Sequence, residues 1–280
     1  MTDMRRRRFV RERFLQLAGL LIVLWSVGPF LWQVSTSLQP DRLLMETPPS
    51  LLPIPPTFEH FRNVFVIKEF HWYILNSVII AGATTLFCLL FGTLGAFALA
   101  RFDIRGRYGI LGVILSISMF PQIAIVAPLY LTMSSLNLLD TYTSLIVIDL
   151  ALGLPLVIWV LFGYFHAIPR EIDEAATIDG AGPLRTLWLI ILPMALPGIV
   201  TTGLLVFIAT WNEFMFALAF TSTIDRQPIP VGIANFQNLY YVPWGDLAAA
   251  SVVVTLPLVA MVLVFQRRII AGLTQGAVKE

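Results

Sequence analysis

The sequence is poor in charged side chains, and this shortage decides the broad class of the protein. Charged residues make up 12% of the 280 residues, whereas soluble domains carry roughly 25%. Hydrophobic types account for 58%, and the mean hydropathy is +0.82. Too few polar side chains remain to cover a water-soluble surface. The composition therefore predicts an integral membrane protein in contact with lipid.

Cysteine and histidine are also scarce. The single cysteine, Cys88, cannot form an internal disulfide or a cysteine-based metal cluster. His60, His71 and His166 are far apart and lack the spacing of metal ligands, so we expect no metal site. The net charge of +1 gives no indication of nucleic-acid binding.

A nucleotide-binding motif is missing as well. No stretch matches G-x-x-x-x-G-K-[ST], the loop that cradles nucleotide phosphates in many ATPases. We therefore expect the chain to bind no cofactor, to hydrolyse no ATP and to contain no catalytic residues.

What the sequence does contain is a series of long apolar stretches. A bilayer core of about 30 Å requires about 20 apolar residues in a helix, and the alternating pattern of a membrane β-barrel is absent. Six stretches are long enough, which predicts an all-α membrane protein with six transmembrane helices. They lie near Phe14–Val34, Trp72–Ala100, Tyr108–Met133, Thr143–Phe165, Leu196–Phe220 and Leu247–Phe265.

Lysine and arginine are distributed unevenly between the connections of these spans. Fourteen of them lie before span one, between spans two and three, between spans four and five, or after span six, and four lie in the other connections. The positive-inside rule then predicts that both termini are cytoplasmic. A basic start followed by an apolar run also fits a secretory signal, but the run is longer than a signal core and no A-x-A site follows. We expect an uncleaved first span.

The six spans predict a single transmembrane domain over residues 1–280. Its connections are a first periplasmic segment at 35–71, a cytoplasmic loop at 166–195, a periplasmic loop at 221–246 and a cytoplasmic tail at 266–280. Six prolines in the first segment disfavour regular helix there. The aromatic residues of the second periplasmic loop are compatible with contact to a partner and equally with anchoring at the lipid headgroups.

The cytoplasmic loop carries the signals of two short helices separated by a sharp break. Pro169 suits a first helical turn, and the acidic residues within 171–174 place negative charge near the positive end of the helix dipole. Gly180 can adopt the left-handed conformation that ends a helix, and Pro183 begins the next one. A short exposed helix with small alanine side chains suits docking into a groove on a cytoplasmic partner.

The same loop contains a family pattern. It reads Glu174-Ala175-Ala176, three residues, Gly180, nine residues, Ile190, one residue, then Leu192-Pro193. This pattern resembles the EAA loop of the permease subunits of binding-protein-dependent ABC importers. Other stretches are similar to the maltose and trehalose permease branch, among them Trp211-Asn212-Glu213 and the C-terminal Gln266 to Lys279, so the resemblance covers nearly the whole chain.

The resemblance implies a type I ABC importer permease fold in a bacterial or archaeal inner membrane. It implies three partners: a second permease subunit, a dimer of ATP-binding subunits that holds ATP and Mg²⁺, and an extracytoplasmic sugar-binding protein. The chain would form half of the pathway of an ATP-driven importer for a sugar such as trehalose or maltose. Glycerol phosphate remains an alternative solute, although none of the predicted spans contains an arginine to recognise phosphate.

The resemblance also implies roles for particular residues. In the family the loop is a coupling helix seated in a cleft of the ATPase, which implies this contact for Glu174, Ala175, Ala176, Asp179 and Gly180. The family's tail reaches the ATPase interface, which implies the same for Gly272, Leu273, Thr274, Gln275 and Gly276. One permease loop enters the cleft of the binding protein, and the corresponding residues here are Asp225, Gln227, Asn235 and Asn238.

Polar and aromatic residues of spans three and five are the candidates for lining the substrate pathway, because sugars bind planar polar groups and aromatic faces. They are Gln122, Tyr130, Asn137, Trp211, Asn212 and Glu213. Polar groups inside a membrane normally face the bundle interior, so Glu213 is equally suited to hydrogen bonding between helices.

Two other classes of function fit less well. A self-sufficient secondary transporter or channel would need charged residues along the full path or internal pseudo-symmetry, and neither is evident. An intramembrane enzyme would need a nucleophile–base pair or a metal constellation, which the sequence also lacks. Co-purification of a stoichiometric ATPase would favour the importer, whereas transport by this chain alone would favour the secondary transporter.

Overall fold

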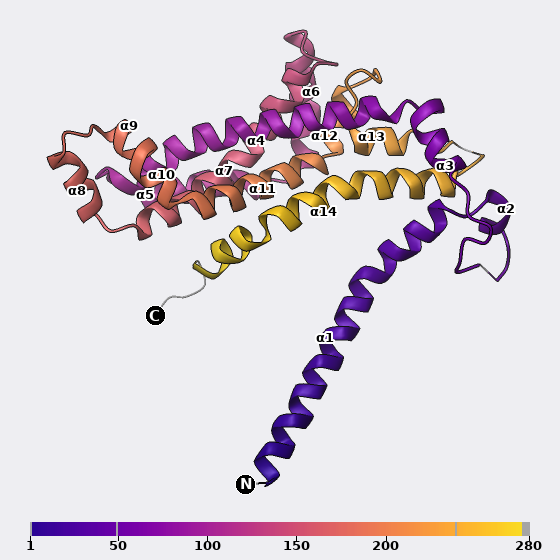
Figure 1. The fold of residues 1–280 in the computed structure, drawn as a ribbon. Helices are drawn as coiled ribbons and strands as arrows, with labels where there is room; N and C mark the ends of the chain where they lie inside the picture. Colours follow the sequence, from indigo (N-terminus) through magenta and orange to yellow (C-terminus); the bar gives the residue numbers. More distant parts are fainter. Residues whose placement is uncertain (1, 49, 239, 276–280) are drawn as a thin grey trace. The chain divides into compact units, whose positions relative to one another are not determined.

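A computed structural model describes residues 2–48, 50–238 and 240–275 of the chain. All regular elements within these residues are helical (Figure 1), in agreement with the predicted all-α class. The chain divides into two compact units. The first contains Met1–Phe70 and Asn235–Leu256, and the second contains His71–Ala234 and Pro257–Glu280.

The first unit begins with the long helix α1 (Thr2–Ser37), whose segment Glu12–Ser37 is apolar enough to cross a membrane. The remaining elements of this unit are α2 (Asp41–Leu44), α3 (Glu59–Arg62), the π-helical turn η1 (Asn63–Ile67) and the first part of α14 (Trp244–Gln275). Apart from α2, the described parts of the proline-rich stretch, 40–48 and 50–56, form no regular helix, because proline lacks the N–H that a helix interior requires.

A buried histidine joins three segments of the first unit. His60 is 4% exposed, with Nδ1 at 2.9 Å from Oδ1 of Asp246 and Nε2 at 2.9 Å from the carbonyl oxygen of Gln39. The ring lies against Gly245, where an added Cβ would overlap it. The end of α1, the α3 segment and the start of α14 are thereby held together.

The second unit is a helical bundle built around α4 (Phe70–Arg101) and α7 (Tyr142–Ala167). Its other elements are α5 (Arg107–Ser118), α6 (Gln122–Ser135), α8 (Glu171–Ile178), α9 (Pro183–Thr186), η2 (Leu187–Ile191), α10 (Leu192–Met194), α11 (Leu196–Trp211), α12 (Met215–Phe220) and α13 (Ile229–Ala234).

Helices α4 and α7 run parallel and pack closely along their length. Near their midpoints a Cβ added at Gly153 would lie 2.9 Å from Sγ of Cys88, so α7 approaches α4 there because glycine has no side chain. One apolar cluster lies toward the C-terminal ends of both helices and includes Phe97, Phe165 and Leu187. A second cluster lies toward their N-terminal ends and includes Ile80, Leu145, Phe216 and Phe220.

Four helices are long and apolar enough to cross a membrane, and two bent pairs raise the number to six if each is one span. The parallel course of α4 and α7 favours six spans. Two spans that run in the same direction need an odd number of membrane crossings between them, and the bent pair α5 and α6 can supply that one crossing.

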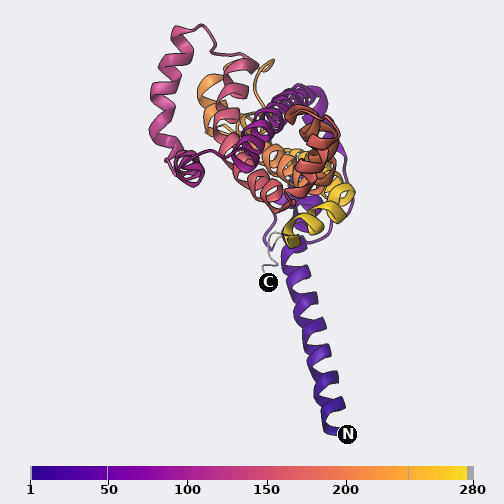
Figure 2. The same cartoon turned by 90° about the vertical axis from the view of Figure 1, so that its left-hand side faces the viewer.

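The predicted third span, Tyr108–Met133, corresponds to a bent pair of helices. Helices α5 and α6 meet at 86°, and Figure 2 shows them close to perpendicular. The break falls at Pro121, which is extended (φ −67°, ψ 119°) and precedes the first residue of α6. Proline has no N–H to continue a helix, and it disfavours the helical conformation in the residue before it.

The predicted fifth span, Leu196–Phe220, is also not one helix. It is divided into α11 and α12, and the residues Asn212 to Phe214 between them are not helical. At its other end α11 is bent by 83° from the helical segment Pro183–Met194. The π-helical turn η2 precedes Pro193, and such a turn accommodates a local change in the backbone hydrogen-bond pattern.

Candidate functional site

The loop after α7 folds as the sequence predicts, with a short helix, a left-handed turn and a second helical segment. Helix α8 has three acidic residues in its first turn, where negative charge is favoured by the helix dipole. Gly180 has a φ of +77°, a conformation that glycine adopts without the steric cost of a Cβ. Pro183 then occupies the first turn of α9.

The two faces of α8 differ in exposure. Ile172 packs against the apolar cluster of Phe97 and Phe165, and Ala176 is 3% exposed. The Ala176 side chain therefore packs within the unit, and its contact with a partner stays a prediction. The other predicted contact residues are all exposed, namely Glu174, Ala175, Asp179 and Gly180.

The sequence analysis missed the most exposed apolar side chain of this helix. Ile178, the last residue of α8, is 86% exposed. Single exposed apolar side chains are common on protein surfaces, but this one lies beside the exposed Asp179 and Gly180. The accessible face of α8 thus combines carboxylates, small residues and one large aliphatic side chain.

A buried arginine connects α8 to the end of α4. Arg101 Nη1 donates a hydrogen bond to the carbonyl oxygen of Ile168 at 2.9 Å and lies 3.3 Å from Oδ2 of Asp173. The Arg101 side chain is 6% exposed and that of Asp173 is 28% exposed. A second ion pair joins the same two segments at the surface, where Arg170 Nη2 lies 3.5 Å from Oδ1 of Asp103.

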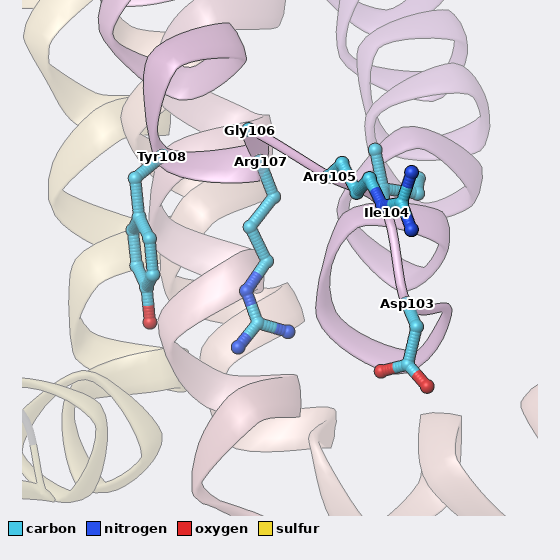
Figure 3. A pocket seen from close by; sticks show the side chains of 6 residues that line it. All are labelled: Asp103, Ile104, Arg105, Gly106, Arg107 and Tyr108. Carbon is cyan, nitrogen blue, oxygen red and sulfur yellow. The ribbon is translucent and has the colours of Figure 1, made fainter.

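The turn between α4 and α5 lines an open hollow of about 360 Å³. Figure 3 shows its six lining residues, with the Arg107 and Tyr108 side chains side by side and Asp103 on the other side. The Arg107 guanidinium lies 5.3 Å from the centre of the Tyr108 ring. The lining carries both signs of charge and is wide open, so it does not select a ligand class.

At the other end of the bundle, the segment after α12 is fixed to α4 and α7. The Asn76 side chain donates hydrogen bonds of 2.9 Å to the carbonyl oxygens of Ile224 and Gln227. The Tyr142 hydroxyl donates to Asn76 Oδ1 at 2.7 Å and to the carbonyl oxygen of Asp225 at 3.1 Å. The segment from 224 to 227 is therefore held by its backbone.

Asp140 fastens the turn between α6 and α7 to the same segment. Its carboxylate accepts hydrogen bonds from the backbone N–H groups of Ser222 and Thr223 and from the Thr223 hydroxyl. Burial tends to raise the pKa of this carboxyl, but these hydrogen bonds outweigh burial, so the pKa of Asp140 lies below its ordinary value.

The break between α11 and α12 is organised by Glu213. Its two carboxylate oxygens accept hydrogen bonds from the backbone N–H groups of Phe216 at 2.8 Å and Ala217 at 2.9 Å. These N–H groups lie in the first turn of α12 and have no partner within that helix. Glu213 thus caps α12, which differs from the hydrogen bonding between helices that was considered from the sequence.

Comparison with known proteins identifies the family. A family model described as "Binding-protein-dependent transport system inner membrane component" matches residues 89–274, which include α8 and the loop around it. The chain belongs to this family. It is therefore a multi-pass inner-membrane permease component, and the resemblance on which the sequence analysis relied is confirmed.

The permease is similar to two sugar permeases over almost its whole length. It is 41% identical to the trehalose/maltose transport system permease protein MalG of Thermococcus litoralis. The alignment of 277 residues covers 98% of this chain and 99% of the relative. It is 38% identical over 271 residues to the trehalose transport system permease protein SugB of Mycobacterium tuberculosis, with coverage of 96% and 98%.

A solved structure confirms the fold. The crystal structure of a bacterial ABC transporter involved in the import of the acidic polysaccharide alginate matches with a TM-score of 0.79 and 23% identity, covering 95% of this chain and 98% of that chain. The permease therefore has the fold of an ABC importer permease. Members of this family are permease subunits and are not enzymes themselves.

The predicted pathway residues of the permease differ in accessibility. Gln122, Asn137 and Asn212 are exposed, and Tyr130 is 41% exposed with its ring 6.2 Å from that of Phe220. Trp211 is only 3% exposed and stacks on Phe207 at 5.4 Å. The Trp211 side chain is therefore packed within the chain, and its place in the pathway stays a prediction.

The predicted binding-protein loop of the permease is divided between the two units. Asp225 and Gln227 belong to the second unit, and Gln227 is 8% exposed, so its side chain is not available for docking as predicted. Asn235 and Asn238 belong to the first unit and are exposed. Asn238 Oδ1 accepts hydrogen bonds from the backbone N–H groups of Tyr240 and Tyr241, forming a tight turn.

The predicted tail of the permease is described only in part. Helix α14 continues to Gln275, so Gly272, Leu273, Thr274 and Gln275 are helical in backbone, while Gly276 lies outside the described residues. Among the described residues no group of three or more His, Cys, Asp or Glu side chains could hold a metal ion.

Proposed function

We propose that the permease forms half of the translocation pathway of an ATP-driven importer for a disaccharide, with trehalose and maltose as the first candidates. One observation carries this proposal, namely 41% identity over 98% of the chain with a trehalose/maltose permease. Two further relatives extend the substrate class without changing its character. Permeases named for sulfoquinovosyl glycerol and for diacetylchitobiose are 34% and 33% identical to this chain, and both solutes contain a sugar linked to a second unit.

In this proposal the energy comes from two ATP-binding subunits that hold ATP and Mg²⁺, and this chain binds no cofactor. The cytoplasmic loop 166–195 contacts them through the exposed face of α8, in particular Glu174, Ala175 and Asp179. A short helix with small and acidic residues on one face suits a groove on another protein. Residues 272–276 form a second contact with the same subunits.

The break between α11 and α12 supports a place for the solute. Irregular backbone at membrane depth is tolerated only where it is buried in protein or lines a water-filled cavity. Asn212 lies in this break with an exposed side chain, and Glu213 beside it is partly buried. We assign the pathway to Asn212 and Glu213, together with Gln122 and Tyr130 of the bent third span and Asn137 just after it.

The extracytoplasmic binding protein would dock on the turn at Asn238. This turn presents Tyr240, which is 97% exposed, and the neighbouring Tyr241 and Trp244 are 49% and 57% exposed. Tyrosine and tryptophan are enriched in protein interfaces, since they combine a large apolar area with a polar group. Loops 35–71 and 221–246 are then periplasmic, and both termini are cytoplasmic.

The proposal is tested by reconstituting the permease in lipid vesicles with its second permease subunit, its ATP-binding subunits and its binding protein. We expect ATP hydrolysis and uptake to rise when the binding protein is loaded with trehalose or maltose, and not when it is offered glycerol phosphate or an amino acid. Absence of a response to every glycoside, with a response to another solute, would contradict the sugar assignment.

A further inference from the structure

Helix α8 touches the rest of its unit in two physically different ways. Ile172 and Ala176 make apolar contacts with the bundle, and such contacts have little directional preference, so they allow sliding. The Arg101 guanidinium, in contrast, is buried. It donates a directional hydrogen bond to the Ile168 carbonyl and forms an ion pair with Asp173, whose Oδ2 has no hydrogen-bond partner within the described residues. The second kind of contact resists displacement of α8 relative to α4.

The burial of Arg101 makes this connection stiff. Its Nε and Nη2 atoms are buried and have no hydrogen-bond partner within the described residues. A buried charge that loses its counter-ion is strongly destabilised, so moving Asp173 away from Arg101 carries a high energetic cost. The surface pair Arg170–Asp103 has side chains that are 53% and 89% exposed, and exposed pairs contribute little.

Helix α4 reaches from Arg101 to the opposite end of the bundle without interruption. It is one helix of 32 residues, Phe70–Arg101. The distance along its axis from Asn76 to Arg101 is about 37 Å at 1.5 Å per residue. At the Asn76 end it holds the backbone of the segment 224–227 by two hydrogen bonds of 2.9 Å. Helix α4 is thus attached to α8 at one end and to the loop before α13 at the other.

We propose that Arg101 is a positioning residue that converts α4 into a rigid connection between α8 and the segment 224–227. A displacement of α8 is passed through Asp173 and Ile168 to Arg101, along α4, and through Asn76 to the other end of the pathway. Large conformational switches of this type move packed elements as rigid bodies. This inference rests on the proposed function, since it requires α8 to receive movement from an ATPase.

The test compares solute uptake with ATP hydrolysis in the complete reconstituted complex. Arg101→Gln removes the positive charge, and Asp173→Asn is an isosteric change that removes the ion pair and one of the three negative charges in the first turn of α8. We expect both variants to keep hydrolysing ATP while the amount of solute transported per ATP falls by about two- to thirtyfold, the range expected for a residue that couples two sites. Asn76→Ala should have the same effect from the other end of α4.

Asp103→Asn is the matched control, because it removes the exposed ion pair between the same segments. It should leave uptake per ATP unchanged. If Arg101→Gln prevents assembly of the complex, the test is the comparison of uptake per ATP between Asp173→Asn and Asp103→Asn. Equal uptake per ATP in wild type, Asp173→Asn and Asn76→Ala would overturn the inference. A wild-type complex that shows no ATP-dependent uptake of any solute would instead contradict the proposed function, and the inference with it.

Discussion

His60 and Asp246 are 186 residues apart in sequence, yet Nδ1 of the histidine lies 2.9 Å from Oδ1 of the aspartate. The other ring nitrogen faces the carbonyl oxygen of Gln39, which can only accept a hydrogen bond, so Nε2 must donate. Through its two nitrogens the ring thereby links the Asp246 carboxylate to the backbone of Gln39.

His60→Ala should loosen the first unit. It removes the His60 contact of the buried Asp246 carboxylate, which keeps Asn63 and Lys68 as neighbours, and leaving a buried hydrogen-bonding group without one partner costs about 1–3 kcal/mol. Limited proteolysis of detergent-solubilised protein should show faster cleavage between residues 40 and 70. Glu59→Ala, a change at an exposed neighbour, is the control. Equal cleavage of the two variants would argue against the proposed role of the histidine.

Asp140 provides a test that depends on pH. Its pKa is lower in the folded than in the unfolded state, where it is about 3.9. The ionised carboxylate therefore stabilises the fold at pH values above the unfolded pKa, and this contribution is lost as the pH falls through the depressed folded value. Thermal unfolding of Asp140→Asn should occur below that of wild type at neutral pH.

In acid, the melting temperatures of Asp140→Asn and wild type should converge. Asp225→Asn serves as the control, because only the backbone carbonyl of Asp225 takes part in the Tyr142 contact. A constant difference between Asp140→Asn and wild type at all pH values would show that the carboxylate charge is not responsible.

The sequence was sufficient to predict the class, six apolar stretches and the helix–turn–helix form of the coupling loop. Composition and periodicity carry this information, and Gly180 and Pro183 specify the turn by their backbone preferences alone. Proline inside the spans indicates kinks, but the 86° bend at Pro121 was not predicted, because proline is also found within the single helices α1, α7 and α14. Whether proline bends a helix depends on the neighbours that satisfy the freed carbonyl groups.

The site residues that were missed are those whose role depends on tertiary contact. Arg101 was counted only as a cytoplasmic cation, and its burial against Asp173 follows from the packing of α8 on α4. Ala176 and Trp211 were assigned to functional surfaces, and their side chains are buried within this chain. A residue's type gave its chemistry, but the face of the helix on which it lies decided whether that chemistry is accessible.

The exposed Ile178 predicts an apolar anchor in the contact with the ATP-binding subunits. Burying an isoleucine side chain in a partner's groove stabilises a complex by about 1.5–3 kcal/mol. Ile178→Ser should therefore weaken co-purification of the ATP-binding subunits without lowering the melting temperature of the isolated permease. Leu52→Ser, at a leucine that is 63% exposed in the first unit, should not. Full retention of the ATPase by Ile178→Ser would contradict this role.

The capping role of Glu213 predicts that its variants lower the stability of the permease by different amounts. Glu213→Ala removes both acceptors of the Phe216 and Ala217 N–H groups and should destabilise the permease by about 1 kcal/mol, as loss of a helix cap does. Glu213→Gln retains one acceptor oxygen and should cost less. Thermal unfolding ranks the variants. Asn212→Ala removes only an exposed hydrogen bond to the Ile208 carbonyl oxygen, so it should cost less stability than Glu213→Ala while it reduces uptake. Unchanged uptake would remove Asn212 from the pathway.

The central claim is that α8 receives the movement of an ATPase. Cys88 is fully buried, so a cysteine introduced in place of Ala175 is the accessible thiol on the described part of the chain. In membranes containing the assembled complex, a short thiol–amine cross-linker should join Ala175→Cys to an ATP-binding subunit, with a yield that changes when ATP is bound, and should not do so for Leu52→Cys. Cross-linking of Leu52→Cys alone, or of neither variant, would contradict the account.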